Sequence, residues 1–131
     1  MIDAAINLLL AAQNEDGGWG AVKGKRSNTE STSFALMAMK SVERKSFNQE
    51  KTAGLKWLLQ HQKDDGSWSL NGASKQSSWT TPIAVLALLP FQDQKEYALR
   101  AAKWILTQEG RKPGWLASLL VRLSLVRKTV E

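Results

Sequence analysis

The sequence repeats itself at a spacing of 49 residues, and the segment Leu8 to Ala38 aligns without a gap with Trp57 to Ala87. Repetition on this scale is typical of proteins in which one supersecondary unit buries its apolar face only by stacking on further units. The chain is therefore expected to fold as an array of similar units. The first-copy residues that recur unchanged are Leu9, Leu10, Gln13, Asp16, Gly17, Trp19, Thr32, Ala35 and Ala38.

Each unit is predicted to contain two helices separated by a turn with an Asp-Gly pair. In the second unit, apolar residues at helical spacing end before Asp65 and Gly66, and another apolar helix opens near Thr80. This pattern predicts a single all-α domain over residues 1–131. We expect helices near residues 3–13, 31–43, 50–62, 80–90, 94–108 and 115–127, in hairpins at about 1–46, 47–93 and 94–131.

The third unit follows the repeat only in part. Trp115 stands 47 residues after Trp68. The glutamine and glycine expected before it are replaced by Glu109 and Pro113, and an apolar run reaches from Trp115 to Val126 without a long polar loop. The third hairpin is therefore predicted to be degenerate or terminal.

Composition excludes several classes of protein. The chain has no Cys, so it forms no disulfide and cannot be a thiol enzyme. Its 43% hydrophobic residues include no apolar stretch of the roughly 18 residues that cross a membrane, and the N-terminus lacks the pattern of a secretory signal. A cytoplasmic location is expected, with a peripheral membrane contact as the alternative.

The net charge of +6 is concentrated in the last hairpin. Residues 94–131 carry 8 basic and 3 acidic side chains, against 10 and 9 in residues 1–93. Beside the apolar run, these basic residues could hold an anionic membrane surface weakly, although a solvated basic edge on a terminal helix is the commoner situation. No nucleic-acid partner is expected, because no basic stripe interleaves with aromatic residues. The basic residues beside the run are Arg111, Lys112, Arg122, Arg127 and Lys128.

The turns carry the clearest resemblance to a known family. Both copies have the pattern Leu-x3-Gln-x3-Gly-x-Trp, and this pattern resembles the QW repeat of squalene cyclases and related terpenoid cyclases and prenyltransferases. The resemblance covers nearly the whole chain and implies an α/α toroid, with about half of a full (α/α)6 ring present. The residues that carry it are Gln13, Gly17 and Trp19 in the first copy and Gln62, Gly66 and Trp68 in the second.

The QW residues are predicted to have a structural role. Gln13 and Gln62 lie at helix ends, where an amide can bond orphan backbone groups. Trp19 and Trp68 are expected to be buried against them, so that the turns hold neighbouring hairpins together.

The catalytic motifs that the resemblance implies are incomplete. Squalene-type cyclases protonate their substrate with an Asp-x-Asp-Asp-Thr stretch at an inner helix start, and the matching segment here is residues 28–32, Asn-Thr-Glu-Ser-Thr. Glu30 takes the place of the proton donor, but the carboxylates that would tune it are missing. Glu30 is therefore a weak candidate acid. Its equivalent in the second copy is Trp79, which cannot serve as one.

No cofactor or metal is expected. Prenyltransferase-like relatives hold zinc with Asp, Cys and His, whereas this chain has no Cys and the single histidine His61. His61 is predicted to be a surface residue of a helix. The resemblance alone thus does not make the chain an enzyme.

An arc of three hairpins would leave its inner face partly exposed, including Phe34, Leu36, Ile83 and Val85. Two functions follow from such a face. The chain could bind an apolar isoprenoid, or complete a larger ring with a second copy or the remaining half of a toroid. Alternatively, it could be a noncatalytic module that binds a protein or peptide. The cavity-facing candidates are Thr32, Phe34, Trp79, Thr81 and Ile83.

Overall fold

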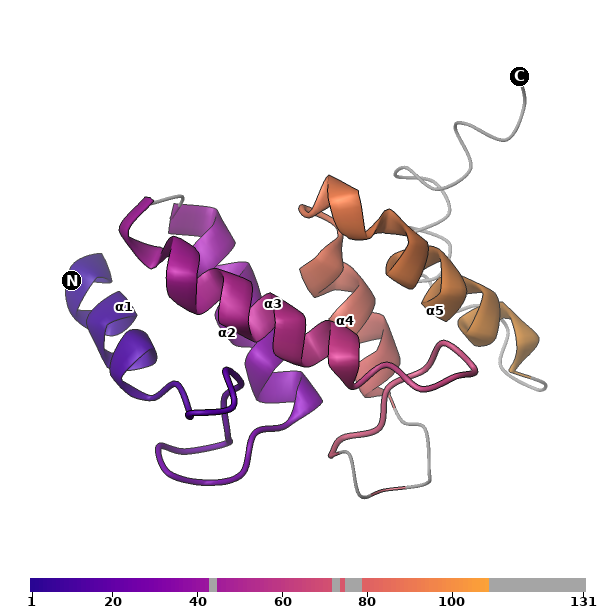
Figure 1. The fold of residues 1–131 in the computed structure, drawn as a ribbon, viewed down its shortest axis with the longest axis horizontal. Helices are drawn as coiled ribbons and strands as arrows, with labels where there is room; N and C mark the ends of the chain where they lie inside the picture. Colours follow the sequence, from indigo (N-terminus) through magenta and orange to yellow (C-terminus); the bar gives the residue numbers. More distant parts are fainter. Residues whose placement is uncertain (43–44, 72–73, 75–78, 109–131) are drawn as a thin grey trace.

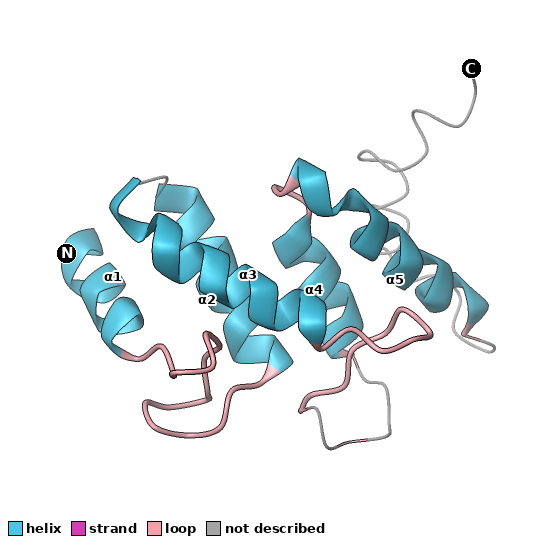
Figure 2. Ribbon diagram, viewed as in Figure 1, coloured by secondary structure: helices cyan, strands magenta, loops and turns pink. Residues whose placement is uncertain are grey.

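The computed structural model describes residues 1–42, 45–71, 74 and 79–108, and this part of the chain contains helices and no strand (Figure 2). The all-α prediction is confirmed. The predicted helix at 115–127 lies outside the described residues. The α-helices are α1 (Ile2–Ala11), α2 (Thr29–Val42), α3 (Asn48–Gln60), α4 (Thr80–Leu88) and α5 (Lys95–Thr107), and short 3₁₀ helices at Lys45–Phe47 and Gln92–Gln94 precede α3 and α5.

The five helices in the described part begin and end within two residues of the predicted bounds, and the differences have physical causes. α2 begins at Thr29 rather than at residue 31, because Asn28 caps it: the Asn28 Oδ1 accepts the N–H of Ser31 at 2.8 Å. α1 and α3 end two residues before Gln13 and Gln62, which belong to the turns.

The helices form two layers. α2 and α4 lie side by side in one layer, α3 packs on α2, and α5 packs on α4. α1 touches α2 more slightly, at the end of the row of helices that Figure 1 shows. Each inner helix is therefore covered mainly by the outer helix that follows it in the chain. In the sequence, each repeat is an outer helix followed by an inner helix. In the structure, the inner helix of one repeat packs mainly on the outer helix of the next repeat.

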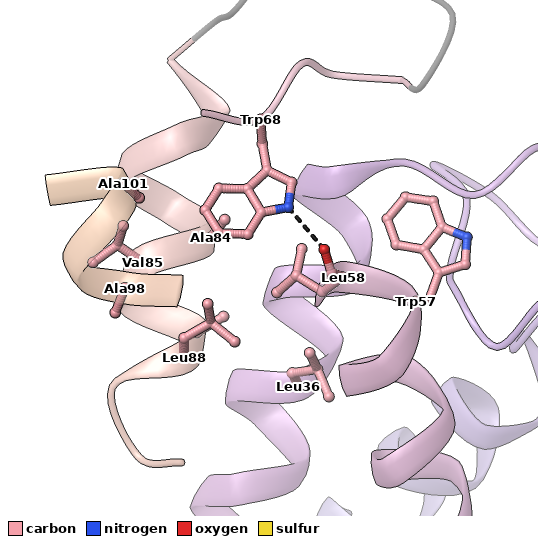
Figure 3. Close-up of a cluster of buried hydrophobic side chains, with 10 residues drawn as sticks. Leu36, Trp57, Leu58, Trp68, Ala84, Val85, Leu88, Ala98 and Ala101 are labelled. Carbon is pink, nitrogen blue, oxygen red and sulfur yellow. Dashed lines mark hydrogen bonds between the residues drawn. The ribbon is translucent and has the colours of Figure 1, made fainter. Parts of the chain in front are cut away.

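Trp68 lies where three of these helices meet. Its indole Nε1 donates to the carbonyl oxygen of Leu58 in α3 at 2.8 Å, and its backbone N–H donates to the Thr81 Oγ1 of α4 at 2.9 Å. Its ring is fully buried in a cluster that includes Ala101 of α5 (Figure 3). One side chain thus joins an outer helix, the next inner helix and the next outer helix.

Trp19 makes the same junction in the first unit. Its Nε1 donates to the carbonyl oxygen of Leu9 at 2.8 Å, and its backbone N–H donates to the Thr32 Oγ1 at 3.0 Å. A Cβ added to Gly54 of α3 would lie 2.6 Å from the Trp19 Cζ3, so the ring lies directly on that glycine. The burial predicted for Trp19 and Trp68 is confirmed, and each indole bonds a carbonyl at the end of an outer helix.

Replacing Trp68 with alanine is predicted to lower the free energy of unfolding by about 3–5 kcal/mol, because the substitution leaves a cavity at a three-helix junction. The matched control is Trp79→Ala, since Trp79 is 55% exposed. It should change the free energy of unfolding by no more than about 0.5 kcal/mol. Urea unfolding followed by circular dichroism measures both values. Equal losses of unfolding free energy for the two variants would contradict the packing of Trp68 between three helices.

Candidate functional site

The two QW glutamines tie each turn to the next outer helix. The Gln13 Nε2 donates to the carbonyl oxygens of Gly17, at 2.8 Å, and of Glu50 in α3, at 2.9 Å. The Gln62 Nε2 donates at 2.9 Å to the carbonyl oxygens of Gly66 and of Tyr97 in α5. In each unit the first bond closes the turn, and the second holds that turn against the following outer helix.

The QW glycines are required for two reasons. Gly17 and Gly66 have φ of +88° and +90°, in the left-handed region that side chains disfavour. A Cβ on Gly17 would also lie 2.8 Å from the Ala53 carbonyl oxygen, and one on Gly66 would lie 2.6 Å from that of Arg100. Any side chain here would strain the turn and push away the next outer helix.

Asp16 anchors the same turn to α3. One carboxylate oxygen, Oδ1, accepts the Gly18 N–H at 3.0 Å and the Ser27 hydroxyl at 2.7 Å, and Oδ2 accepts the Trp57 Nε1–H at 3.0 Å. Burial alone would raise the pKa of Asp16. The hydrogen bonds from Ser27, Gly18 and Trp57, together with the charge of His61, outweigh burial and hold the pKa below its ordinary value of 3.8. Asp16 is therefore a structural carboxylate.

The sequence reading missed the role of Trp57, and it misplaced His61. His61 follows the last residue of α3 and is half-buried, whereas a surface position inside a helix was expected. Its ring stacks on Trp57 with centroids 3.8 Å apart, and its Nδ1 lies 2.7 Å from the Trp57 carbonyl oxygen. The recurrence of Trp57 as Trp104, 47 residues later in the chain, was the available signal.

The segment that corresponds to the acidic motif serves mainly to position α2. Asn28 caps the helix, and Thr29 is buried and donates its hydroxyl to the carbonyl oxygen of Ser69 at 2.7 Å. Thr32 binds the backbone of Trp19. Glu30 lies in the first turn and is partly exposed, and no described side chain donates a hydrogen bond to it.

Two of the cavity-facing candidates do not face an open surface. Thr32 and Thr81 are fully buried, and their hydroxyl groups accept the backbone N–H groups of the two QW tryptophans. Leu36 and Val85 were also expected on the exposed inner face, and both are fully buried instead. The reason is that α3 and α5 cover these sides of the inner helices.

The remaining candidates do form an open face on the inner helices. Phe34 is 51% exposed, Trp79 is largely exposed, and Ile83 is half-buried. Phe34 and Ile83 occupy equivalent positions in α2 and α4, and Glu30 and Trp79 do the same at the starts of these helices. Because α2 and α4 lie side by side, equivalent positions face the same way. We refer to Glu30, Phe34, Trp79 and Ile83 as the inner face.

The described residues offer no sign of metal chemistry or of a membrane span. They contain no group of three or more His, Asp or Glu side chains placed to hold a metal ion. Within the same ranges, no helix combines the length and the apolar character needed to cross a bilayer. The inner face therefore offers apolar and aromatic contacts together with one carboxylate.

Asp16→Asn is predicted to destabilise the protein in a pH-dependent way. The pKa of Asp16 is lowered in the folded state, so its contribution is fully present above pH 3.8 and disappears as the pH falls through the folded-state value. The difference in unfolding free energy between wild type and Asp16→Asn should thus be constant near neutral pH and shrink below about pH 3.8. Urea unfolding across pH measures it. Glu15→Gln is the control. A difference in unfolding free energy that grows as the pH falls would refute the structural role of the Asp16 carboxylate.

Comparison with known proteins agrees with this geometry. The family model for the squalene-hopene cyclase C-terminal domain matches residues 1–76, which include α1, α2, α3 and both QW turns. No curated protein matches the sequence significantly. The matched segment is more than half of the chain, and it carries the Gln, Gly and Trp contacts that join neighbouring units. The chain therefore belongs to the squalene-hopene cyclase C-terminal domain family, whose fold is an α/α toroid.

Proposed function

We propose that this terpenoid-cyclase-like repeat domain binds an apolar isoprenoid chain along its inner face and does not itself catalyse cyclisation. The observation that carries the proposal is the exposure of Phe34 and Trp79 on adjacent inner helices of a fold that buries its other described Trp and Phe side chains more deeply. Large exposed apolar groups of this kind usually mark a contact surface. Membership of the cyclase family supports an isoprenoid as the ligand.

The inner face suits a flexible hydrocarbon. Phe34 and Trp79 offer ring faces, and Ile83 continues the apolar surface along α4. A ligand lying across α2 and α4 would remove these groups from water and gain about 25 cal/mol for each Å² of apolar area buried. The helices need not move for this, because buried threonines and tryptophans already hold their starts.

Catalysis is not part of the proposal. Protonating an alkene needs a strong acid, and in this family paired carboxylates tune the donor. Glu30 has Asn28 and Ser31 as its motif neighbours, and the Oδ1 of Asn28 is already bonded to the Ser31 N–H. Glu30 instead provides a charged group at the edge of the inner face.

Binding is tested with the full chain and two probes, farnesol and squalene, in equilibrium dialysis with radiolabelled ligand. We expect saturable binding, with Phe34→Ser and Trp79→Ser each raising the dissociation constant about tenfold through lost apolar contact. Val22→Ser is the matched control, because Val22 is an exposed aliphatic residue outside the inner face and should leave the constant unchanged.

Two outcomes would reject this function. Absence of saturable binding to either probe would leave the protein- or peptide-binding module as the better account. Conversely, cyclised products from squalene that disappear in Glu30→Gln would show that the domain is an enzyme with Glu30 as its acid. Gas chromatography with mass detection follows the products.

A further inference from the structure

A groove of about 320 Å³ lies between the outer helices α3 and α5, which Figure 1 labels in the row of helices. Its apolar lining comes from Leu55 and Leu59 of α3 and from Tyr97 of α5, and all three side chains are half-buried. The volume is at the lower end of the roughly 300–1,000 Å³ that small-molecule sites occupy. None of the described residues that line the groove belongs to α2 or α4, so the groove is separate from the inner face.

The corresponding place at the first pair of outer helices, α1 and α3, is filled by an aromatic ring. Ile6 and Leu10 of α1 stand 49 residues before Leu55 and Leu59. Phe47 is only 6% exposed, and it belongs to the apolar cluster that contains Ile6 and against which Leu10 packs. Ile6 is accordingly 5% exposed, whereas Leu55 is left half-buried.

Gln94 stands in the groove where Phe47 stands in the first pair. The two residues are 47 positions apart, and each directly precedes an outer helix, α3 or α5. Their backbones are alike, since φ and ψ are −106° and 11° at Phe47 and −104° and 16° at Gln94. The groove therefore results from a change of side chain on a similar backbone, with a polar amide in place of the ring.

The groove also has a polar part. Lys56 is the only charged side chain among the described residues that line it, and the neutral residue Asn7 takes the corresponding place on α1. The other polar residues of the lining are Thr52, Gln60 and Gln94. Within the described ranges, no hydrogen bond or ion pair engages the side chain of Lys56 or of these three residues. One cation and two amide groups are therefore available to an anionic ligand.

We propose that this groove binds a small aromatic carboxylate. The single ring of the ligand lies against the apolar lining, in the place that the Phe47 ring takes beside α1. Tyr97 offers this ring an aromatic neighbour, and the Lys56 ammonium pairs with the carboxylate. Because an exposed ion pair is weak, burial of the ring supplies most of the affinity. A ligand of this size should bind with a dissociation constant of about 0.1–1 mM.

Nuclear magnetic resonance of the isotope-labelled full chain tests binding, with hydrocinnamate as the probe. The side-chain amide signals of Gln60 and Gln94 report on the groove directly, because both residues line it. We expect both signals to shift and to saturate with one dissociation constant. The side-chain amide of Gln13 is the internal control and should not shift, since it is bonded within the first turn.

Gln94→Phe gives the groove the ring that the first pair of outer helices has. The substitution should raise the dissociation constant for hydrocinnamate about tenfold or more, because the new ring takes the place of the ligand. It should also raise the urea midpoint, since it covers half-buried apolar groups. This gain in stability distinguishes a blocked groove from a misfolded variant. Val22→Phe adds the same ring at an exposed residue outside the groove and should change the dissociation constant less than about twofold.

Lys56→Gln tests the recognition of the carboxylate. It should raise the dissociation constant for hydrocinnamate about threefold and leave that for the neutral hydrocinnamyl alcohol unchanged. Lys23→Gln, at an exposed lysine outside the groove, should affect neither ligand. The proposal is overturned by an absence of saturable shifts, by hydrocinnamate binding retained in Gln94→Phe, by a lowered urea midpoint of that variant, or by equal effects of Lys56→Gln on the acid and the alcohol.

Discussion

The structure depends on one tryptophan in each unit that contacts three helices at once. The Trp68 indole bonds a carbonyl at the end of α3, its backbone bonds a threonine of α4, and its ring fills the contact with α5. Trp19 does the same one unit earlier. Because the bonded groups are buried, breaking any of these contacts would leave a polar group unpaired as well as a cavity. The fold is therefore built from junctions rather than from hairpins that are stable separately.

The same junctions determine which surfaces stay open. Four side chains are buried at or beside these junctions: Thr32, Thr81, Leu36 and Val85. Phe34 and Trp79 stay exposed on the inner helices. In α1, Ile2 is 66% and Leu8 is 73% exposed.

Sequence reasoning reached the all-α fold, the helices and the buried tryptophans because each leaves a periodic pattern in the chain. It failed for Thr32 and Thr81, since a threonine at a helix start reads as a cap or a cavity residue until the tryptophan backbone that it binds is known. It failed for Leu36 and Val85 because periodicity gives the apolar side of a helix but not which neighbour covers it. For Phe34 and Trp79 the expected exposure is seen, at 51% and 55%, and their role in binding stays a prediction.

If the tryptophan junctions join the units, then neighbouring units must unfold together. Urea unfolding followed by nuclear magnetic resonance of the indole Nε1–H signals of Trp19 and Trp68 measures this most directly, because these two protons are bonded to the carbonyl oxygens of Leu9 and Leu58. The account predicts that both folded-state signals disappear with the same midpoint and the same steepness. Separate midpoints, with one unit retaining its signal after the other has lost it, would contradict the claim.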